Sequence, residues 1–179
     1  MKNKDNALCR ELSLKQTARY LKKHDNYIIL THASPDGDTL GSAYALYYGL
    51  NEIGKTACVL CPDVIHKKYD FFVRPTNHVH REGATIIAVD IADKKLLGAL
   101  EEEFGDKIDL NIDHHISNPK YATYNLVMPK ASSTGEILYL LCEEMGFEWD
   151  EKAASLLYGS IASDTGCFCH SNTSPDTHR

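Results

Sequence analysis

The chain has 179 residues, enough to bury one hydrophobic core, and its 43% hydrophobic and 25% charged residues are typical of a globular protein. Its net charge of −6 argues against a sequence-independent grip on long duplex nucleic acid, which requires a basic surface. No apolar run reaches membrane-spanning length, and residues 1–6 lack the apolar core of a signal peptide, so we expect a cytoplasmic protein with no membrane partner.

The first predicted elements are a helix, a strand and a second helix. Residues 13–16 form a capping-box pattern that predicts a helix with Leu14, Ala18 and Leu21 at helical spacing. Residues 27–31 are apolar and β-prone, which predicts a buried strand. A helical pattern then runs from about residue 39 to residue 53, and Gly54 follows as its end signal.

Between this strand and the second helix lie His32, Asp36 and Asp38, in the spacing H-x-x-x-D-x-D. A strand, a polar turn and a helix are how open α/β sheets build binding sites, at the carboxyl end of the strand. One imidazole and two carboxylates suit a divalent metal ion. The alternative is a solvated turn in which Asp38 only caps the following helix.

Strands and helices continue to alternate downstream. Strands are expected at residues 56–60, 85–90, 108–113 and 124–127. Helices are expected after three N-cap signals, and we expect them to bury these apolar residues: Leu96, Leu97, Leu100 and Phe104 after Asp93; Ile137, Leu138, Leu141 and Met145 after Ser133; Ala153, Ala154, Leu157 and Ile161 after Asp150. This alternation predicts an α/β fold with a mainly parallel sheet and helices on both faces.

Six cysteines and several histidines offer other candidate sites. Cys58 and Cys61 form C-x-x-C, but no second pair follows at zinc-ribbon spacing. Cys167 and Cys169 lie close to His170, which allows a zinc corner as an alternative. We expect reduced cysteines, and we expect His78 and His80 to be surface loop residues without a ligand role.

Polar residues follow the predicted strands and the last helix, namely His32, Asp36, Asp38, Asp90, Asp113, His114, His115 and Asp164. Parallel strands place their carboxyl ends along one edge of the sheet, so these side chains can converge. Five carboxylates in one place would repel one another strongly, and two divalent ions would compensate them and supply a catalyst. No serine or cysteine nucleophile lies beside a base in this set, so the expected attacking group is a metal-activated water.

Four motifs in order resemble those of the DHH phosphoesterase family. They are His32-Ala-Ser-Pro-Asp36-Gly-Asp38, Val89-Asp90, Asp113-His114-His115 and Asp164-Thr165-Gly166. Residues 131–136 and 168–173 are similar to the bacterial nanoRNases of this family that also remove the 3′-phosphate from phosphoadenosine phosphate. The resemblance covers about residues 13–179.

The resemblance implies a pair of manganese ions bridged by Asp90. His32 and Asp36 would bind the first ion, while Asp38, His114 and Asp164 would bind the second. Asp113 would orient His114 from outside the ligand set, and His115 would face the substrate phosphate and assist proton transfer. The simpler alternatives are a turn residue for Asp113 and a plain surface histidine for His115.

The implied function is metal-dependent hydrolysis of short oligoribonucleotides and phosphoadenosine phosphate. The alternatives are a phosphodiesterase for cyclic di-AMP or a linear dinucleotide, and a metal- or nucleotide-binding module without turnover. We allow for a homodimer. Members of the family continue into a second domain that helps hold the substrate, so residues 1–179 are expected to be the DHH catalytic domain, truncated at its C-terminus, with the substrate-binding domain absent.

Overall fold

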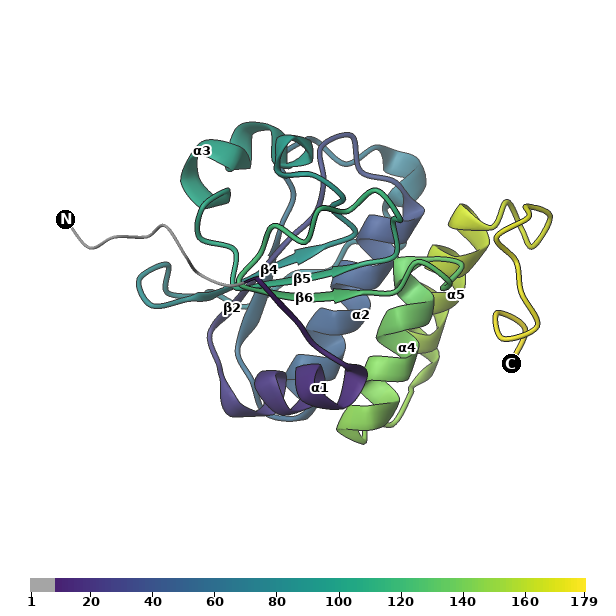
Figure 1. The fold of residues 1–179 in the computed structure, drawn as a ribbon, viewed down its shortest axis with the longest axis horizontal. Coiled ribbons are helices and arrows are strands. Elements are labelled where there is room, and N and C mark those ends of the chain that lie inside the picture. The colour runs from purple at the N-terminus through teal and green to yellow at the C-terminus, as the bar shows by residue number, and fades with distance from the viewer. Residues whose placement is uncertain (1–8) are drawn as a thin grey trace.

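The structure, a computed structural model, describes residues 9–179, so the prediction about residues 1–6 lies outside the described residues. Six parallel strands form one sheet in the order β1-β6-β5-β4-β2-β3 (Figure 1). The strands are β1 (Arg10–Glu11), β2 (Tyr27–Leu30), β3 (Ala57–Leu60), β4 (Thr85–Val89), β5 (Leu110–Asp113) and β6 (Tyr124–Val127). The predicted parallel α/β sheet is confirmed, and the two-residue strand β1 is the one that the sequence patterns did not predict.

The strand order reverses between β2 and β4. From β2 the chain passes outward to β3 at one edge, then returns to β4 on the other side of β2 and continues to β5 and β6. The connections that leave the carboxyl ends of β2 and β4 therefore diverge, and ligand sites of open α/β sheets lie at such a point.

Helices cover the two faces of the sheet unequally. On one side lie α1 (Leu14–Lys23), α2 (Gly37–Glu52), α4 (Thr134–Met145) and α5 (Glu151–Asp164), and on the other side α3 (Glu101–Phe104) with the preceding 3₁₀ helix η2 (Lys94–Leu100) (Figure 1). A short 3₁₀ helix η1 (Lys67–Tyr69) lies in the loop after β3. Along β2, Tyr27 and Ile29 pack into the larger core, whereas Ile28 and Leu30 pack into the smaller one. The prediction of helices on both faces is confirmed.

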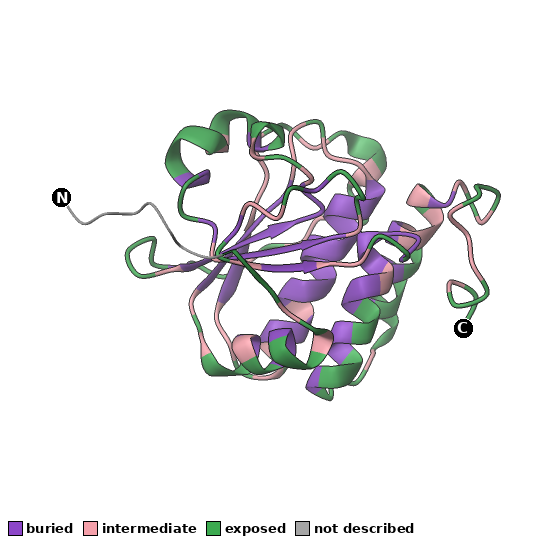
Figure 2. Cartoon of the chain, in the orientation of Figure 1, coloured by how far each residue is buried: buried purple, intermediate pink, exposed green. Residues whose placement is uncertain are grey.

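Helix α2 is buried around most of its circumference (Figure 2). It begins at Gly37, two residues before the predicted start, because Asp36 Oδ1 accepts hydrogen bonds from the backbone N–H groups of Asp38 and Thr39. Asp36 is therefore the helix cap. The alternative in which Asp38 caps the helix is wrong, since the Asp38 side chain is buried and bonds elsewhere.

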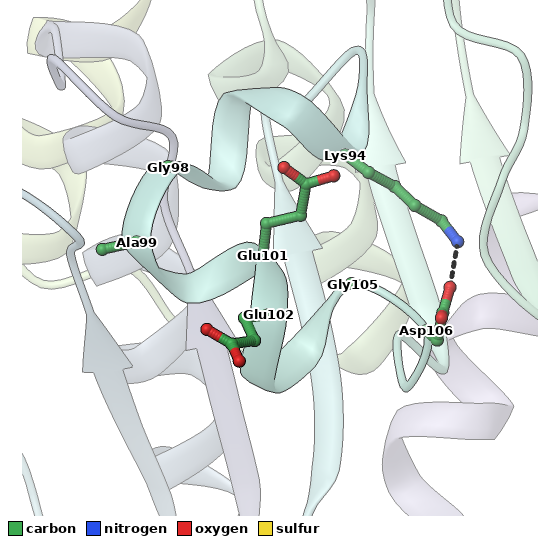
Figure 3. A pocket seen from close by; sticks show the side chains of 7 residues that line it. All are labelled: Lys94, Gly98, Ala99, Glu101, Glu102, Gly105 and Asp106. Carbon is green, nitrogen blue, oxygen red and sulfur yellow. Dashed lines mark hydrogen bonds and ion pairs between the residues drawn. The ribbon is translucent and has the colours of Figure 1, made fainter.

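The segment expected to form one helix after Asp93 forms η2 and the short α3, with a kink at Gly98 inside η2. Gly98 interrupts it with φ +53°, a left-handed value at which a helix cannot continue. Leu97 and Phe104 are buried as predicted, but Leu96 is 42% exposed. A pocket of about 500 Å³ lies over this broken segment, where Lys94 contacts Asp106 at 2.9 Å (Figure 3), and its lining includes none of the predicted site residues.

The remaining helices agree largely with the predictions. The capping box of α1 is complete, and the four predicted apolar residues of α4 are buried. In α4, Ser133 caps the helix, but the Glu136 carboxylate accepts from Ser132. In α5, Ala153 and Leu157 are buried as predicted, whereas Ala154 is exposed and Ile161 is half-buried, because Leu156 and Ser160 occupy the inward face.

The loop position predicted for His78 and His80 is confirmed. All six cysteines are free thiols, and His78 and His80 are exposed in a loop. Within residues 9–179 no helix combines the length and apolar character needed to cross a membrane.

Candidate metal centre

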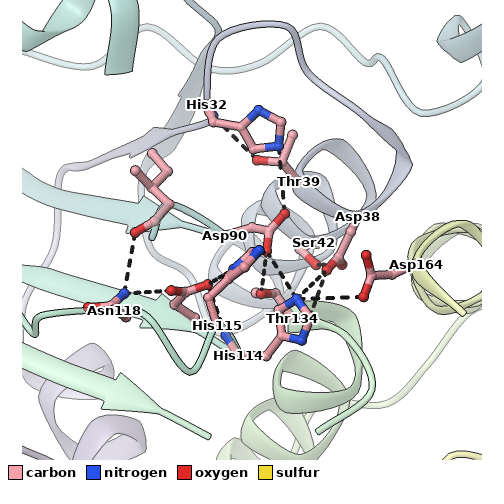
Figure 4. A network of polar contacts seen from close by, with 12 residues as sticks. His32, Asp38, Thr39, Ser42, Asp90, His114, His115, Asn118, Thr134 and Asp164 are labelled. Carbon is pink, nitrogen blue, oxygen red and sulfur yellow. Dashed lines mark hydrogen bonds and ion pairs between the residues drawn. The ribbon is translucent and has the colours of Figure 1, made fainter. Parts of the chain in front are cut away.

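The eight predicted site residues converge at the carboxyl edge of the sheet, beside the reversal between β2 and β4. His32 follows β2, Asp36 and Asp38 begin α2, and Asp90 follows β4. Asp113 is the last residue of β5, His114 and His115 follow it, and Asp164 is the last residue of α5. Six of the eight are labelled in Figure 4, where their polar ends point toward one another.

His32, Asp36 and Asp90 form a first ligand group, in which one potential ligand atom of each lies within 4.8 Å of the others. His32 Nε2 is 3.6 Å from Asp36 Oδ1 and 3.8 Å from Asp90 Oδ2. On the other side of the ring, His32 Nδ1 donates to the Ala33 carbonyl at 2.7 Å. That hydrogen bond directs Nε2 at the carboxylates, the arrangement usual for metal-ligating histidine.

Asp38, His114 and Asp164 form a second ligand group with the same spacing limit. His114 Nε2 lies 3.8 Å from Asp38 Oδ2 and 3.6 Å from Asp164 Oδ2, while its Nδ1 lies 3.3 Å from the Ala131 carbonyl. His114 Nε2 is buried and has no hydrogen-bond partner among the described residues. A buried polar atom of this kind is costly unless something else contacts it.

Asp90 faces both groups. Its Oδ2 lies 3.8 Å from His32 Nε2, and its Oδ1 lies 3.8 Å from His114 Nε2. Its backbone has φ +60°, a left-handed conformation that is uncommon outside glycine and is found at functional sites. The Asp90 N–H donates to the Ile112 carbonyl at 2.9 Å, and Thr134 Oγ1 donates to Asp90 Oδ1 at 2.8 Å. These contacts hold the carboxylate between the two groups.

Asp38 is held by the N-terminus of α4. Its Oδ2 accepts from the Thr134 N–H at 2.8 Å, and its Oδ1 accepts from the Gly135 N–H at 3.1 Å. Ser160 Oγ and Ser42 Oγ also donate to Oδ1, at 2.5 Å and 3.0 Å. A helix N-terminus favours negative charge, so this position suits a carboxylate. The sequence patterns do not predict these four donors, although residues 131–136 are part of the resemblance to the family.

Burial and mutual repulsion raise the pKa of three carboxyl groups. The pKa of Asp90 is raised well above its ordinary value. Burial is the largest cause, and the nearby Asp38 and Asp36 charges add to it. Burial also raises the pKa of Asp38 and of Asp164. A cation between these carboxylates would reduce their repulsion and would give the buried His114 Nε2 a partner. The residues present therefore fit a divalent metal centre.

Asp36 and His32 behave differently. Burial alone would raise the pKa of Asp36, but the His32 ring and the N–H groups of Thr39 and Asp38 outweigh it, and its pKa is lowered. Burial alone would lower the pKa of His32, but Asp36 and the Ala33 carbonyl raise it. In this pair each partner stabilises the charged form of the other.

Asp113 orients His115 rather than the ring of His114. Asp113 Oδ1 accepts from His115 Nδ1 at 2.7 Å, and from His114 only through its backbone N–H, at 2.9 Å. The expectation that Asp113 orients His114 is thus wrong for the ring, because the Ala131 carbonyl takes that place. Asp113 raises the pKa of His115, and the His115 side chain is 43% exposed toward solvent. The pKa of Asp113 is lowered because His115 and Asn118 outweigh its burial.

Asn172 is a further residue that the motifs did not predict as part of the site. Its side-chain N–H₂ group lies 2.8 Å from the Ser132 carbonyl and 3.3 Å from Asp164 Oδ2. It therefore links the end of α5 to the loop before α4. The segment 168–173 resembled a family subgroup, but no local pattern connected Asn172 to Asp164.

The chain is similar to known proteins over most of its length. Residues 26–161 match the family model of the DHH family, N-terminal domain. A Thermus thermophilus protein named bifunctional oligoribonuclease and PAP phosphatase NrnA is 33% identical over 156 residues, which cover 84% of this chain and 47% of that protein. The Bacillus subtilis protein of the same name is 30% identical over 164 residues, which cover 89% and 52%. The chain thus spans about half the length of the curated relatives it matches.

The fold is also similar to a solved structure, the crystal structure of an exopolyphosphatase-related protein from Bacteroides fragilis. The TM-score is 0.74 with 23% sequence identity, and the match covers 92% of this chain and 53% of that one. At this identity the likeness concerns the fold alone.

Proposed function

The chain belongs to the DHH family, and on that premise we propose that it is a metal-dependent phosphoesterase that hydrolyses short nucleotides, namely short oligoribonucleotides and phosphoadenosine phosphate. The relatives named as oligoribonuclease and PAP phosphatase support this substrate class. One observation supports the proposal most strongly: a buried imidazole nitrogen of His114 faces three carboxylates without a hydrogen-bond partner among the described residues.

The ligand assignment follows the two groups. His32 and Asp36 would bind one divalent ion, Asp38, His114 and Asp164 would bind a second, and Asp90 would contact both. When bound, such ions supply positive charge for the transition state and lower the pKa of water, and we propose manganese as the metal. An ion at the second group would also compensate the buried Asp38 carboxylate, which the N-terminus of α4 holds in place.

His115 is proposed to act on the substrate. Asp113 fixes its Nδ1 as the hydrogen-bond donor, so Nε2 is the ring atom free to meet a phosphate oxygen or the leaving oxygen. His115 Nδ1 also lies 3.7 Å from Asp90 Oδ1, but that nitrogen is already bonded to Asp113 and is unsuited to bind metal. A protonated His115 donates to a phosphate oxygen, and its raised pKa enlarges the protonated fraction near neutral pH.

The test is a substrate panel with the purified chain in Mn²⁺ and in excess EDTA. The panel contains phosphoadenosine phosphate, a dinucleotide, a short oligoribonucleotide, cyclic di-AMP, pyrophosphate and a long DNA duplex. We expect Mn²⁺-dependent release of phosphate from the first and of mononucleotide from the next two, with no product from the duplex. The control is Asp90→Asn, which keeps the side-chain shape but removes the shared charge.

Two outcomes would contradict the proposal. No product from any substrate would favour a metal- or nucleotide-binding module without turnover. Equal product from Asp90→Asn and from the unmodified chain would show that the activity belongs to a contaminant or to another site.

A further inference from the structure

Behind His115, on the side away from the ligand groups, lies a buried network of amide side chains. Asn118 is 7% exposed and lies between β5 and β6, three residues after His115. Asn111 is fully buried within β5. Neither residue belongs to the two ligand groups. Figure 4 shows Asn118 joined to the carboxylate that bonds His115.

The hydrogen bonds of Asn118 use both ends of its amide. Its Nδ2 lies 2.5 Å from Asp113 Oδ2 and 2.7 Å from Asn111 Oδ1. Its Oδ1 accepts from the Lys120 N–H at 2.7 Å. Because that backbone group is a donor, the oxygen of the amide must face Lys120, and the nitrogen must face Asp113. The amide thus has one satisfied orientation.

Asn111 extends the network to the turn that carries Asp90. Its Nδ2 lies 3.2 Å from the Ile91 carbonyl and 3.2 Å from the Tyr121 hydroxyl, and that hydroxyl donates to the same carbonyl at 2.9 Å. Ile91 directly follows Asp90 in the chain. The network therefore connects the turn after β4 to the segment that carries His115.

We propose that Asn118 is a positioning residue for His115, acting through Asp113. By donating to Asp113 Oδ2, Asn118 fixes the carboxylate so that Oδ1 meets His115 Nδ1 and the ring presents Nε2 to the site. Only the predicted effect on catalysis rests on the proposed function, because the orientation of the His115 ring does not depend on turnover.

The physical reason is the burial of Asp113, which is fully inaccessible to solvent. Without Asn118, Asp113 Oδ2 loses its amide donor in a place where water does not replace it without rearrangement. The carboxylate then turns toward other donors, and its bond to the half-exposed His115 ring loosens. An outer partner of a site residue costs about 10- to 100-fold in affinity or activity when it is removed.

The test uses Asn118→Ala and Asn118→Asp, with Asn125→Ala as the matched control. Asn125 is a buried asparagine of β6 that pairs with Asn111 across the sheet, but its side chain bonds only to Ala122 in the described structure. Asn125→Ala therefore shows how the loss of a buried amide that does not contact Asp113 affects the same measurements. Asn118→Asp keeps the size of the side chain and removes the donors that face Asp113.

The first readout is the Nδ1 proton of His115 in the metal-free, ¹⁵N-histidine-labelled chain, with its resonance assigned by comparison with His115→Gln. We expect a downfield signal protected from exchange in the unmodified chain and in Asn125→Ala, and its loss in both Asn118 variants. A signal retained in either folded Asn118 variant would overturn the proposal.

The second readout separates this proposal from the proposed function. With Mn²⁺, both Asn118 variants should bind as much metal as the unmodified chain, keep KM, and lose kcat by about 10- to 100-fold. Loss of metal or a changed KM with kcat intact would overturn the positioning role. If the unmodified chain hydrolyses nothing, the proposed function fails, while the proton signal still decides the role of Asn118.

Discussion

Asp90 faces both ligand groups, but the two groups differ in what surrounds them. In the second group, the Asp38 side chain is 1% exposed, and burial raises the pKa of both Asp38 and Asp164. In the first group, the Asp36 side chain is 49% exposed, caps α2 and has a lowered pKa. Apart from Asp90, whose pKa is raised, the first group is therefore better compensated without a cation than the second, so we expect the second group to bind its ion more tightly.

Asp90→Ala should have the largest effect. It should weaken metal binding at both groups and so remove the difference between them. The carboxylate that faces His32 and His114 is lost, so metal binding should weaken at each group by more than the roughly 100-fold that an outer partner costs. Metal content after gel filtration measures this, with far-ultraviolet circular dichroism as the control for folding. Full metal content in the folded variant would disprove the shared role of Asp90.

Asp38→Ala and Asp36→Ala should separate the two groups. Asp38→Ala should abolish the tighter metal-binding step and leave buried donors unpaired, at a cost of about 1–3 kcal/mol in unfolding free energy. Asp36→Ala should abolish only the weaker step and lose a helix cap worth about 1 kcal/mol. Calorimetric Mn²⁺ titration measures both, and Asp36→Ser is the control that keeps a cap without the charge. Loss of the same step in both variants would refute the distinction.

Adjacent histidines should give different results. His114 belongs to the second ligand group, whereas His115 Nδ1 is bonded to Asp113. We expect His114→Ala to weaken metal binding, and His115→Ala to leave metal binding intact while turnover falls about 10²- to 10⁴-fold, the usual contribution of a general acid or base. Metal titration and kcat/KM measure the two effects. Equal metal loss in both variants would contradict this division of roles.

The smallest expected effect is a pH dependence of stability in the metal-free chain. The raised carboxyl pKa values of Asp38, Asp90 and Asp164 mean that the folded state holds these protons more tightly than the unfolded state. Their contribution to stability is therefore present at low pH and is lost as pH rises from the ordinary carboxyl pKa of about 3.9 through the raised values. The raised pKa values of His32 and His115 act in the same direction, and the lowered values of Asp36 and Asp113 act against it.

Thermal unfolding at about pH 5.5 and about pH 8, in EDTA and in Mn²⁺, tests this balance. We expect a lower unfolding temperature at the higher pH in EDTA, by about 2–4 °C for each kcal/mol lost, and the reverse in Mn²⁺ because deprotonated ligands bind metal. Asp90→Asn should reduce the dependence in EDTA. A rise in unfolding temperature with pH in EDTA would contradict the raised pKa values, because the lowered pKa values of Asp36 and Asp113 change stability only below about pH 4.

Much of the fold and the positions of the site residues could be predicted from the sequence. The strands are short apolar runs, and parallel strands place their carboxyl ends at one edge, so His32, Asp90 and Asp113 had to approach one another. The break at Gly98 was missed because the apolar spacing continues through it, and only its left-handed φ ends the helix. The two-residue strand β1 is too short to carry a periodic pattern.

The contacts within the site were harder to predict because they depend on packing between distant elements. The donors to Asp38 come from α2, α4 and α5, and no spacing in one helix shows which serine will face another helix. Which histidine ring bonds to Asp113 depends on the side-chain conformations of His114 and His115, and the order of the motifs does not specify those conformations.

The central claim is that two divalent ions bind side by side and share Asp90. The most direct measurement is anomalous diffraction at the manganese absorption edge from crystals of the chain grown with Mn²⁺. The account predicts two anomalous peaks about 3.5–4 Å apart, one beside His32 and Asp36 and one beside Asp38, His114 and Asp164, with Asp90 contacting both. A single peak, or a peak that Asp90 does not contact, would contradict it.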